Sequence, residues 1–159
     1  MHFTLLELLL LSSCILPQAL AAIYALTDNY VGTDFLTGFI FQNITDPTNG
    51  RVTYVTEETA VALNLTYASG DTLIMRADDT TILDPDGPGR NSVRIMSVNN
   101  YTTHVAVFDI RHMPEGCSTW PAAWETGATN WPDCGEVDIC HRLRKHDLRL
   151  ICFIPGSKA

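Results

Sequence analysis

Two carboxylates that alternate along one short segment are the residues of this chain best placed to do chemistry. Glu136 and Asp138 stand in the stretch Gly135-Glu136-Val137-Asp138-Ile139. Because side chains two positions apart lie on the same face of a β-strand, a strand here would present both carboxylates together. Paired carboxyl groups can act as nucleophile and proton donor, although acidic alternation is also common on solvated strand edges. The apolar neighbours Val137 and Ile139 favour a chemical role for the two carboxylates over a solvated strand edge.

Three tryptophans precede the carboxylates. Trp120 and Trp124 lie in the cluster Trp120-Pro121-Ala122-Ala123-Trp124-Glu125, and Trp131 follows in Asn130-Trp131-Pro132-Asp133. An indole ring can stack on the apolar face of a sugar, but most tryptophans are substantially buried. On composition alone, core packing is therefore the more common role of Trp120 and Trp124, and both roles stay open for Trp131.

The elements that hold these residues are predicted to be short strands separated by turns. Clusters of Pro, Gly, Asn and Asp predict turns at 46–50 and 84–89. β-Branched, aromatic and alternating residues predict strands at 35–42, 51–55, 71–77, 92–98 and 103–111, the last buried on both faces. Residues 57–65 fit either one helical turn or a loop leading into a strand. This pattern predicts an all-β, antiparallel sandwich.

The amino-terminal residues predict secretion. Leu5 to Leu16 is an apolar run too short to span a bilayer, and Ala19-Leu20-Ala21 follows as a small-x-small cleavage site. We interpret residues 1–21 as a signal peptide, the alternative being a buried amphiphilic helix. The chain is then expected to be secreted and extracellular, with no membrane association after cleavage.

Glycosylation sequons and cysteines agree with that compartment. Three Asn-x-Thr sequons begin at Asn43, Asn64 and Asn100. Four cysteines remain after cleavage, and sequence cannot choose between their three full pairings. They are Cys117, Cys134, Cys140 and Cys152. Their spacing does not suggest a zinc site.

Charge is distributed unevenly along the chain. About 138 mature residues suit one domain, and the formal net charge is −8. Up to Ile139 there are five arginines, no lysines and seventeen acidic residues, whereas residues 140–159 hold five basic residues and one acid, Asp147. A basic tail can bind nucleic acid or a membrane surface. A secreted acidic protein gives little reason for either partner, and we expect neither.

Residues 24–139 resemble the amino-terminal half of a glycoside hydrolase family 16 enzyme, most closely the fungal laminarinase-type endo-1,3(4)-β-glucanases. The stretches that carry the resemblance are Asn29-Tyr30-Val31-Gly32, Asp46-Pro47-Thr48, Gly50-Arg51-Val52, Leu65-Thr66-Tyr67-Ala68-Ser69-Gly70, Gly89-Arg90-Asn91-Ser92-Val93-Arg94-Ile95, Phe108-Asp109-Ile110-Arg111-His112-Met113-Pro114 and Cys117 through Glu125. The resemblance implies a concanavalin-like β-jelly-roll sandwich, incomplete and comprising about the first half of the family fold. It divides the chain into a signal peptide (1–21), a partial family domain (22–139) and a basic tail (140–159), in which we expect no strands.

The family signature Glu-x-Asp-x-x-Glu can be carried onto this chain residue by residue. By resemblance Glu136 matches the nucleophile and Asp138 the assisting aspartate, while His141 occupies the position of the acid/base glutamate. In the family a β-bulge returns that later position to the face of the nucleophile. Retaining glycosidases need two carboxyl groups roughly 5 to 5.5 Å apart, and histidine has a different reach and geometry. No metal or nucleotide cofactor is required.

The same resemblance implies a glucan-binding surface. Trp120 and Trp124 become cleft residues, against the core-packing expectation, and Arg90 and Asn91 become sugar contacts on the non-reducing side. The implied partner is a β-glucan polysaccharide, bound by a monomer.

The sequence therefore supports three hypotheses. The first is a secreted retaining endo-1,3(4)-β-glucanase lineage, truncated at the catalytic strand, in which this chain is inactive because His141 replaces the second glutamate. The second is a non-catalytic secreted glucan-binding module. The third is the product of a disrupted gene, with the tail translated through a retained intron or in a shifted frame.

Overall fold

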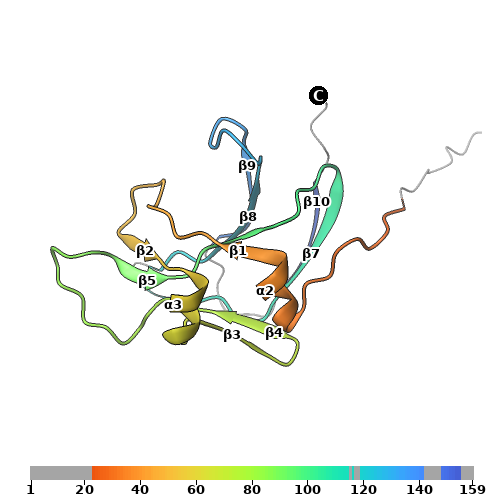
Figure 1. Ribbon diagram of the computed structural model, residues 1–159. Coiled ribbons are helices and arrows are strands. Elements are labelled where there is room, and N and C mark those ends of the chain that lie inside the picture. Colours follow the sequence, from red (N-terminus) through yellow and green to blue (C-terminus); the bar gives the residue numbers. More distant parts are fainter. Residues whose placement is uncertain (1–22, 115, 117–118, 142–147, 155–159) are drawn as a thin grey trace, which may run out of the picture.

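Short strands dominate the part of the chain that the computed structural model describes, which is residues 23–114, 116, 119–141 and 148–154 (Figure 1). The predicted signal peptide lies outside these residues. The elements in chain order are η1 (Gly32–Asp34), α2 (Phe35–Gly38), β1 (Phe39–Phe41), β2 (Val52–Tyr54), α3 (Glu57–Ala62), β3 (Thr66–Ser69), β4 (Thr72–Met75), β5 (Arg90–Ser92), β6 (Ile95–Ser97), β7 (His104–Ile110), β8 (Ala122–Thr126), β9 (Glu136–His141) and β10 (Leu148–Ile154).

The described strands associate in pairs. Four pairs are antiparallel, namely β1–β6, β3–β4, β7–β10 and β8–β9. The pair β2–β5 is parallel, which corrects the purely antiparallel arrangement predicted from the sequence. The physical reason is the long crossover that parallel strands require. Here α3, β3 and β4 supply it between β2 and β5.

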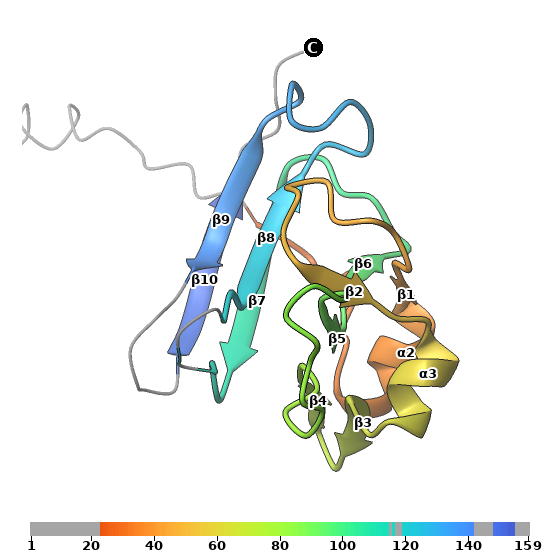
Figure 2. The same ribbon diagram turned by 90° about the vertical axis from the view of Figure 1, so that its left-hand side faces the viewer.

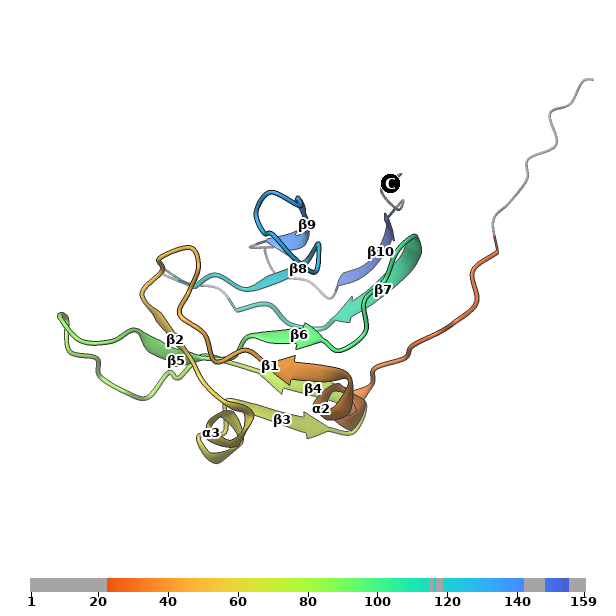
Figure 3. The same cartoon turned by 45° about the horizontal axis from the view of Figure 1, so that its top comes forward.

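The strands fall into two groups in space. In Figure 2, β7, β8, β9 and β10 stand on one side, and β1 to β6 with the two helices stand on the other. Figure 3 shows α3 at the end of the molecule farthest from β8 and β9. The buried hydrophobic core of the described residues is small and lies near α3. It consists of Val55, Ala60 and Leu65, with Phe41 and Val93 packed against it.

Helix α3 settles the alternatives left open for residues 57–65. Thr56 caps its amino terminus by accepting a hydrogen bond from the Thr59 backbone N–H at 3.3 Å. At its other end Asn64 takes a positive φ of 55°, and the Leu65 backbone N–H bonds to the Ala60 carbonyl at 2.7 Å.

Among the helices of the described residues, none has the length and apolar character that crossing a membrane would need.

The strand predicted at 35–42 is wrong over its first half. Residues 32–38 form η1 and α2, and only Phe39–Phe41 is extended. Because the chain turns through α2, Phe35 and Phe39 stack with ring centroids 5.0 Å apart. Tyr30 packs edge-on against Phe39 at 5.1 Å and fills the space where a side chain at Gly38 would lie. This aromatic cluster favours the helical turn over a strand.

Three further strand predictions need correction. The single strand expected at 92–98 is interrupted, since only Ser92 belongs to β5 and Ile95–Ser97 forms β6, which pairs with a different strand. Strand β7 is present, but Val107 is 66% exposed, so the strand is not buried on both faces. The tail also forms a strand: β10 pairs with β7 from Leu148 opposite Ile110 to Ile154 opposite His104. Residues 150–154 are all apolar, a short run that the basic composition of the tail conceals.

Candidate active site on the β8–β9 hairpin

The two candidate carboxylates lie on β9, and a register shift shapes the face they share. Glu136 pairs with Thr126 and Asp138 with Trp124, but Cys140 pairs with Ala123. Ile139 is therefore the extra residue of a bulge. Beyond it, position 141 pairs with Ala122, which returns this position to the row that contains Glu136 and Asp138. The bulge implied by the family resemblance is present, whereas the His141 side chain lies outside what the structure describes.

The loop between β8 and β9 is closed by hydrogen bonds, and it carries Trp131 to Glu136. The Cys134 backbone N–H bonds to the Asn130 carbonyl at 3.1 Å, and the Gly135 N–H bonds to the Pro132 carbonyl at 3.0 Å. The Thr126 hydroxyl donates to the Gly135 carbonyl at 2.8 Å. Asn130 and Gly135 adopt positive φ values of 63° and 86°. Tight turns often need positive φ, and Asn and Gly tolerate it best.

Trp131 makes the most direct contact with a candidate catalytic group. Its indole Nε1–H donates to Glu136 Oε2 at 2.6 Å. The Trp131 ring also meets the Trp124 ring edge-on, with centroids 6.4 Å apart. One carboxylate oxygen of Glu136 is thereby held against the Trp124–Trp131 pair. Sequence left the role of Trp131 open, because the contact depends on how the loop folds.

Arg94 extends this site and was missed as a candidate. Its guanidinium lies over the Trp124 ring at 5.1 Å and over the Tyr54 ring at 5.6 Å from the centroids. Its Nε–H donates to the Gln42 side-chain oxygen at 2.8 Å. Such cation–π contacts stabilise a ring in place. Arg94 belongs to a stretch that carried the family resemblance, but only the fold brings it from before β6 to β8.

The remaining predicted sugar contacts lie in two places. Trp120 precedes β8 and is 68% exposed, so it is available for stacking. Arg90 on β5 donates from Nη1 to the backbone carbonyls of Asp78 and Thr81 at 2.8 and 3.1 Å, which anchors that loop. Asn91 is half-buried, and its carbonyl accepts from the Asp78 N–H at 2.8 Å. The hairpin thus brings together Glu136, Asp138 and Trp124, while Arg90 and Asn91 support the neighbouring loop.

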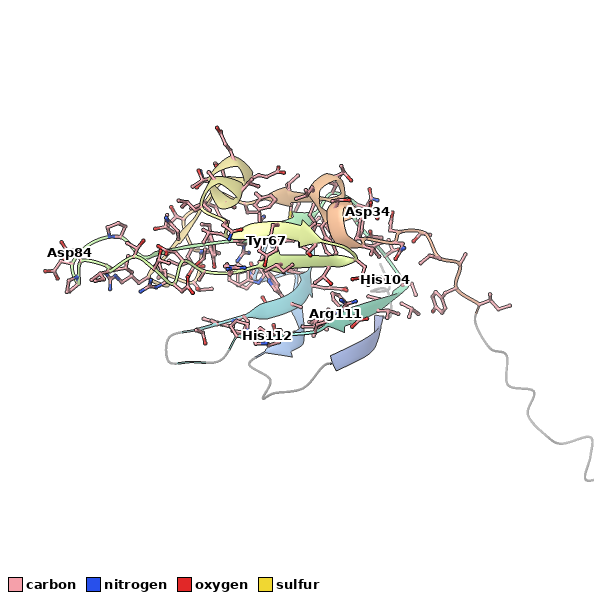
Figure 4. The ribbon with its side chains drawn as sticks, turned by 90° about the horizontal axis from the view of Figure 1, so that it is seen from below. Asp34, Tyr67, Asp84, His104, Arg111 and His112 are labelled. Atoms are coloured by element: carbon pink, nitrogen blue, oxygen red, sulfur yellow. The ribbon has the colours of Figure 1, made fainter. Side chains whose placement is uncertain are left out.

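A histidine–carboxylate contact lies on the opposite face of β8. Glu125 alternates with Trp124, and its Oε2 is 3.1 Å from Nε2 of His104, the first residue of β7, labelled in Figure 4. The other ring nitrogen of His104 contacts the Thr102 carbonyl at 2.7 Å. Both ring nitrogens of His104 therefore face oxygen atoms. This contact ties β7 to β8 behind the candidate site.

The other predicted site features can be placed as well. All three sequon asparagines, Asn43, Asn64 and Asn100, are exposed. Cys134 is a free, exposed thiol. Within the described ranges, no three His, Cys, Asp or Glu side chains gather closely enough to hold a metal ion.

Comparison with known proteins defines the class. The family model described as the XgeA-like, catalytic GH16 domain matches residues 39–148. The probable endo-1,3(4)-β-glucanase of Aspergillus niger is 45% identical over 141 residues, covering 87% of this chain and 19% of that protein. The endo-1,3(4)-β-glucanase xgeA of Emericella nidulans is 43% identical over 134 residues, covering 82% of this chain and 21% of that protein.

Solved structures agree. Laminarinase 16A from Phanerochaete chrysosporium, solved with β-glucans in its donor and acceptor sites, is 61% identical with a TM-score of 0.72 and is matched over 80% of this chain and 44% of that one. An elongating family 16 β-1,3-glucosyltransferase is 38% identical with a TM-score of 0.71, matched over 76% of this chain and 41% of that one. These neighbours confirm the predicted β-jelly roll.

Fold and sequence together define the class as a family of glycoside hydrolases. The chain belongs to glycoside hydrolase family 16, among the XgeA-like catalytic domains. It spans about a fifth of the length of the two fungal glucanases and less than half of the laminarinase.

Proposed function

We propose that the β8–β9 face is the site at which a retaining endo-1,3(4)-β-glucanase lineage binds and attacks its glucan. Glu136 is the nucleophile, Asp138 assists it, and Trp120 and Trp124 stack against glucose rings. The observation that carries the proposal is the bulged β9 register, in which Glu136, Asp138 and position 141 share one row beside Trp124. The relatives named as β-glucanases supply the substrate class.

The geometry suits the first half of a double displacement. Because Trp131 holds Glu136 Oε2 at 2.6 Å, the other carboxylate oxygen can face an anomeric carbon. In a retaining enzyme a second carboxyl group then protonates the leaving oxygen and later activates water. Here residue 141 is histidine. We infer that this chain binds β-1,3(4)-glucan without turning it over.

One alternative has an observation in its favour. The same histidine fits a non-catalytic secreted glucan-binding module, in which Glu136 has no chemical role. The two functions differ in whether Glu136 is still a competent nucleophile, and this can be tested without the missing proton donor.

The experiment uses an activated sugar whose leaving group needs no protonation. In 2,4-dinitrophenyl 2-deoxy-2-fluoro-β-laminaribioside, attack by a carboxylate forms a glycosyl ester, breaks the anomeric C–O bond and releases dinitrophenolate as an anion. We expect mass spectrometry to find the label on the Glu136 peptide. Glu136→Gln should abolish labelling, while Glu57→Gln, an exposed residue on α3, should not.

Other results would assign a different function. Retention of the chain in a laminarin-containing native gel, with Glu136 unlabelled, would favour the binding module. Neither labelling nor retention would overturn a glucan site on this hairpin.

Secretion and a monomeric state are part of the proposal. The apolar run Leu5–Leu16 followed by Ala19-Leu20-Ala21 supports cleavage after residue 21. Expression in a fungal host should yield extracellular protein whose amino-terminal sequence begins at Ala22 or Ile23. Size-exclusion chromatography of this protein should give the apparent mass of a monomer. Intracellular retention of an uncleaved chain would contradict the secretion proposal.

A further inference from the structure

A hollow to which the β8–β9 hairpin contributes no lining residue separates the amino-terminal segment from the loop between β6 and β7. Its volume is about 550 Å³, within the range typical of small-ligand sites. Tyr24 and Asp28 line it from the segment, and Asn100, Tyr101 and His104 line it from the loop and the start of β7. It thus combines two aromatic rings with hydrogen-bonding groups.

The floor of the hollow is ordered by hydrogen bonds to one carboxylate. Tyr101 Oη donates to Asp28 Oδ2 at 2.8 Å, and the Asn99 side-chain amide donates to Asp28 Oδ1 at 3.2 Å. Tyr30 Oη lies 3.3 Å from Tyr101 Oη. Burial, with hydrogen bonds to Tyr30 and Asp28, raises the pKa of Tyr101 well above its usual value, so the phenol stays a neutral donor. The loop is therefore fixed on both sides of Asn100.

Asn100 stands at the rim of this hollow and begins the sequon Asn100-Tyr101-Thr102. Its neighbours Asn99 and Tyr101 are engaged with Asp28, while Asn100 itself is exposed. Asn43 and Asn64 are not among the residues that line the hollow. An N-acetylglucosamine residue has an apolar ring face, which can lie on tyrosine, and hydroxyl and acetamido groups, which can hydrogen-bond.

We propose that Asn100 is N-glycosylated and that the first sugars of its glycan occupy the hollow, stacked against Tyr24 and Tyr101. The attached glycan then fastens residues 23–28 to the β6–β7 loop. In the modification, the Asn100 amide nitrogen bonds to the anomeric carbon of a lipid-pyrophosphate-linked oligosaccharide, loses one proton and displaces the lipid pyrophosphate. The inference rests on the proposed secretion, because this donor acts only in the secretory pathway.

The test uses full-length chain secreted from a glycosylating fungal host. Glycopeptide mass spectrometry should find Asn100 occupied. Under native conditions an endoglycosidase should release the Asn100 glycan several-fold more slowly than the Asn43 glycan, and Tyr24→Ala should remove that difference. Asn100→Gln should speed amide hydrogen exchange over residues 24–28, whereas the matched variant Asn43→Gln should not. Thr102→Ala, which removes the sequon but keeps the asparagine, should reproduce the effect of Asn100→Gln.

Two kinds of failure can be told apart. An unglycosylated Asn100 on a secreted chain in which Asn43 or Asn64 is glycosylated would overturn this proposal alone. Equal release of the Asn100 and Asn43 glycans, with unchanged exchange in Asn100→Gln, would also overturn it. Retention in the cell with all three sequons bare would overturn secretion and this proposal together.

Discussion

The indole N–H of Trp131 donates to Oε2 of Glu136 at 2.6 Å across the loop that joins β8 to β9. Trp131→Phe keeps an aromatic ring but removes the donor, so Glu136 loses its fixed orientation. Because misplacement of a reacting group by about 1 Å can cost roughly 100-fold in rate, we expect the limiting rate of Glu136 labelling by the fluorinated laminaribioside to fall by about 10- to 100-fold.

A control separates orientation from binding. Trp120→Phe should alter the affinity for the reagent and leave the limiting labelling rate unchanged. In the indole region of the NMR spectrum, Glu136→Gln should shift the Trp131 N–H resonance more than that of Trp120. Equal labelling rates for Trp131→Phe and the unaltered chain would show that the hydrogen bond does not position the carboxylate.

Loss of either tryptophan proposed to stack against glucose rings should weaken binding of polymeric glucan. Trp124 is held between Arg94 and Trp131, and Trp120 is 68% exposed ahead of it. An aromatic contact contributes about 0.5–1.5 kcal/mol. Trp120→Ala and Trp124→Ala should therefore each weaken retention in a laminarin gel by about 2- to 10-fold. Unchanged retention for both variants would remove the tryptophans from the cleft.

The small core makes stability sensitive to one leucine. Leu65 is 3% exposed and packs with Val55 and Ala60. Leu65→Ala should lower the free energy of unfolding by about 2–5 kcal/mol, measured by urea denaturation. The matched control is Leu63→Ala, since Leu63 is 50% exposed. A control as destabilised as Leu65→Ala would mean that this core does not hold the fold together.

Acid should destabilise the turn at 46–50. The buried Asp46 carboxylate accepts from the Thr48 hydroxyl at 2.5 Å and the Gly50 N–H at 2.7 Å. The hydrogen bond from the Thr48 hydroxyl has the largest effect on the pKa of Asp46. Together with the bond from the Gly50 N–H, it holds this pKa below its usual 3.8. A lowered folded-state pKa contributes stability that is present above pH 3.8 and lost as pH falls through the lowered value.

The lowered pKa of Asp46 predicts how the melting temperature changes with pH. The melting temperature should fall more steeply below pH 4 for the unaltered chain than for Asp46→Asn. Thr48→Val, which retains the carboxylate but removes its main donor, should also flatten the profile. Parallel profiles for all three proteins would contradict the role of Asp46.

The sequence anticipated those parts of the structure that depend on local pattern. Alternation in Glu136, Val137 and Asp138 predicted a strand with both carboxylates on one face, and the turn residues at 46–50 predicted a turn; both are present. Helix α2 escaped prediction because the packing of Phe35 with Phe39 and Tyr30 outweighs their strand propensity.

Contacts distant in sequence escaped prediction for a different reason. Arg94 reaches Trp124 only because β6 and the β8–β9 hairpin approach each other in the fold. Strand β10 became visible only through its pairing with β7, since a short apolar run at residues 150–154 in a basic tail is a weak signal. Local periodicity therefore located the strand that carries the two candidate carboxylates, while the neighbours that position their side chains required the structure.

Hydrolysis of natural glucan tests the central claim most directly. Purified mature chain and its Glu136→Gln variant would be incubated with laminarin and with lichenan, and the release of reducing ends measured. Because the proton donor contributes about 10²- to 10⁴-fold to such reactions and His141 stands in its place, the two proteins should release reducing ends at the same background rate. Turnover by the unaltered chain that Glu136→Gln abolishes would contradict the account.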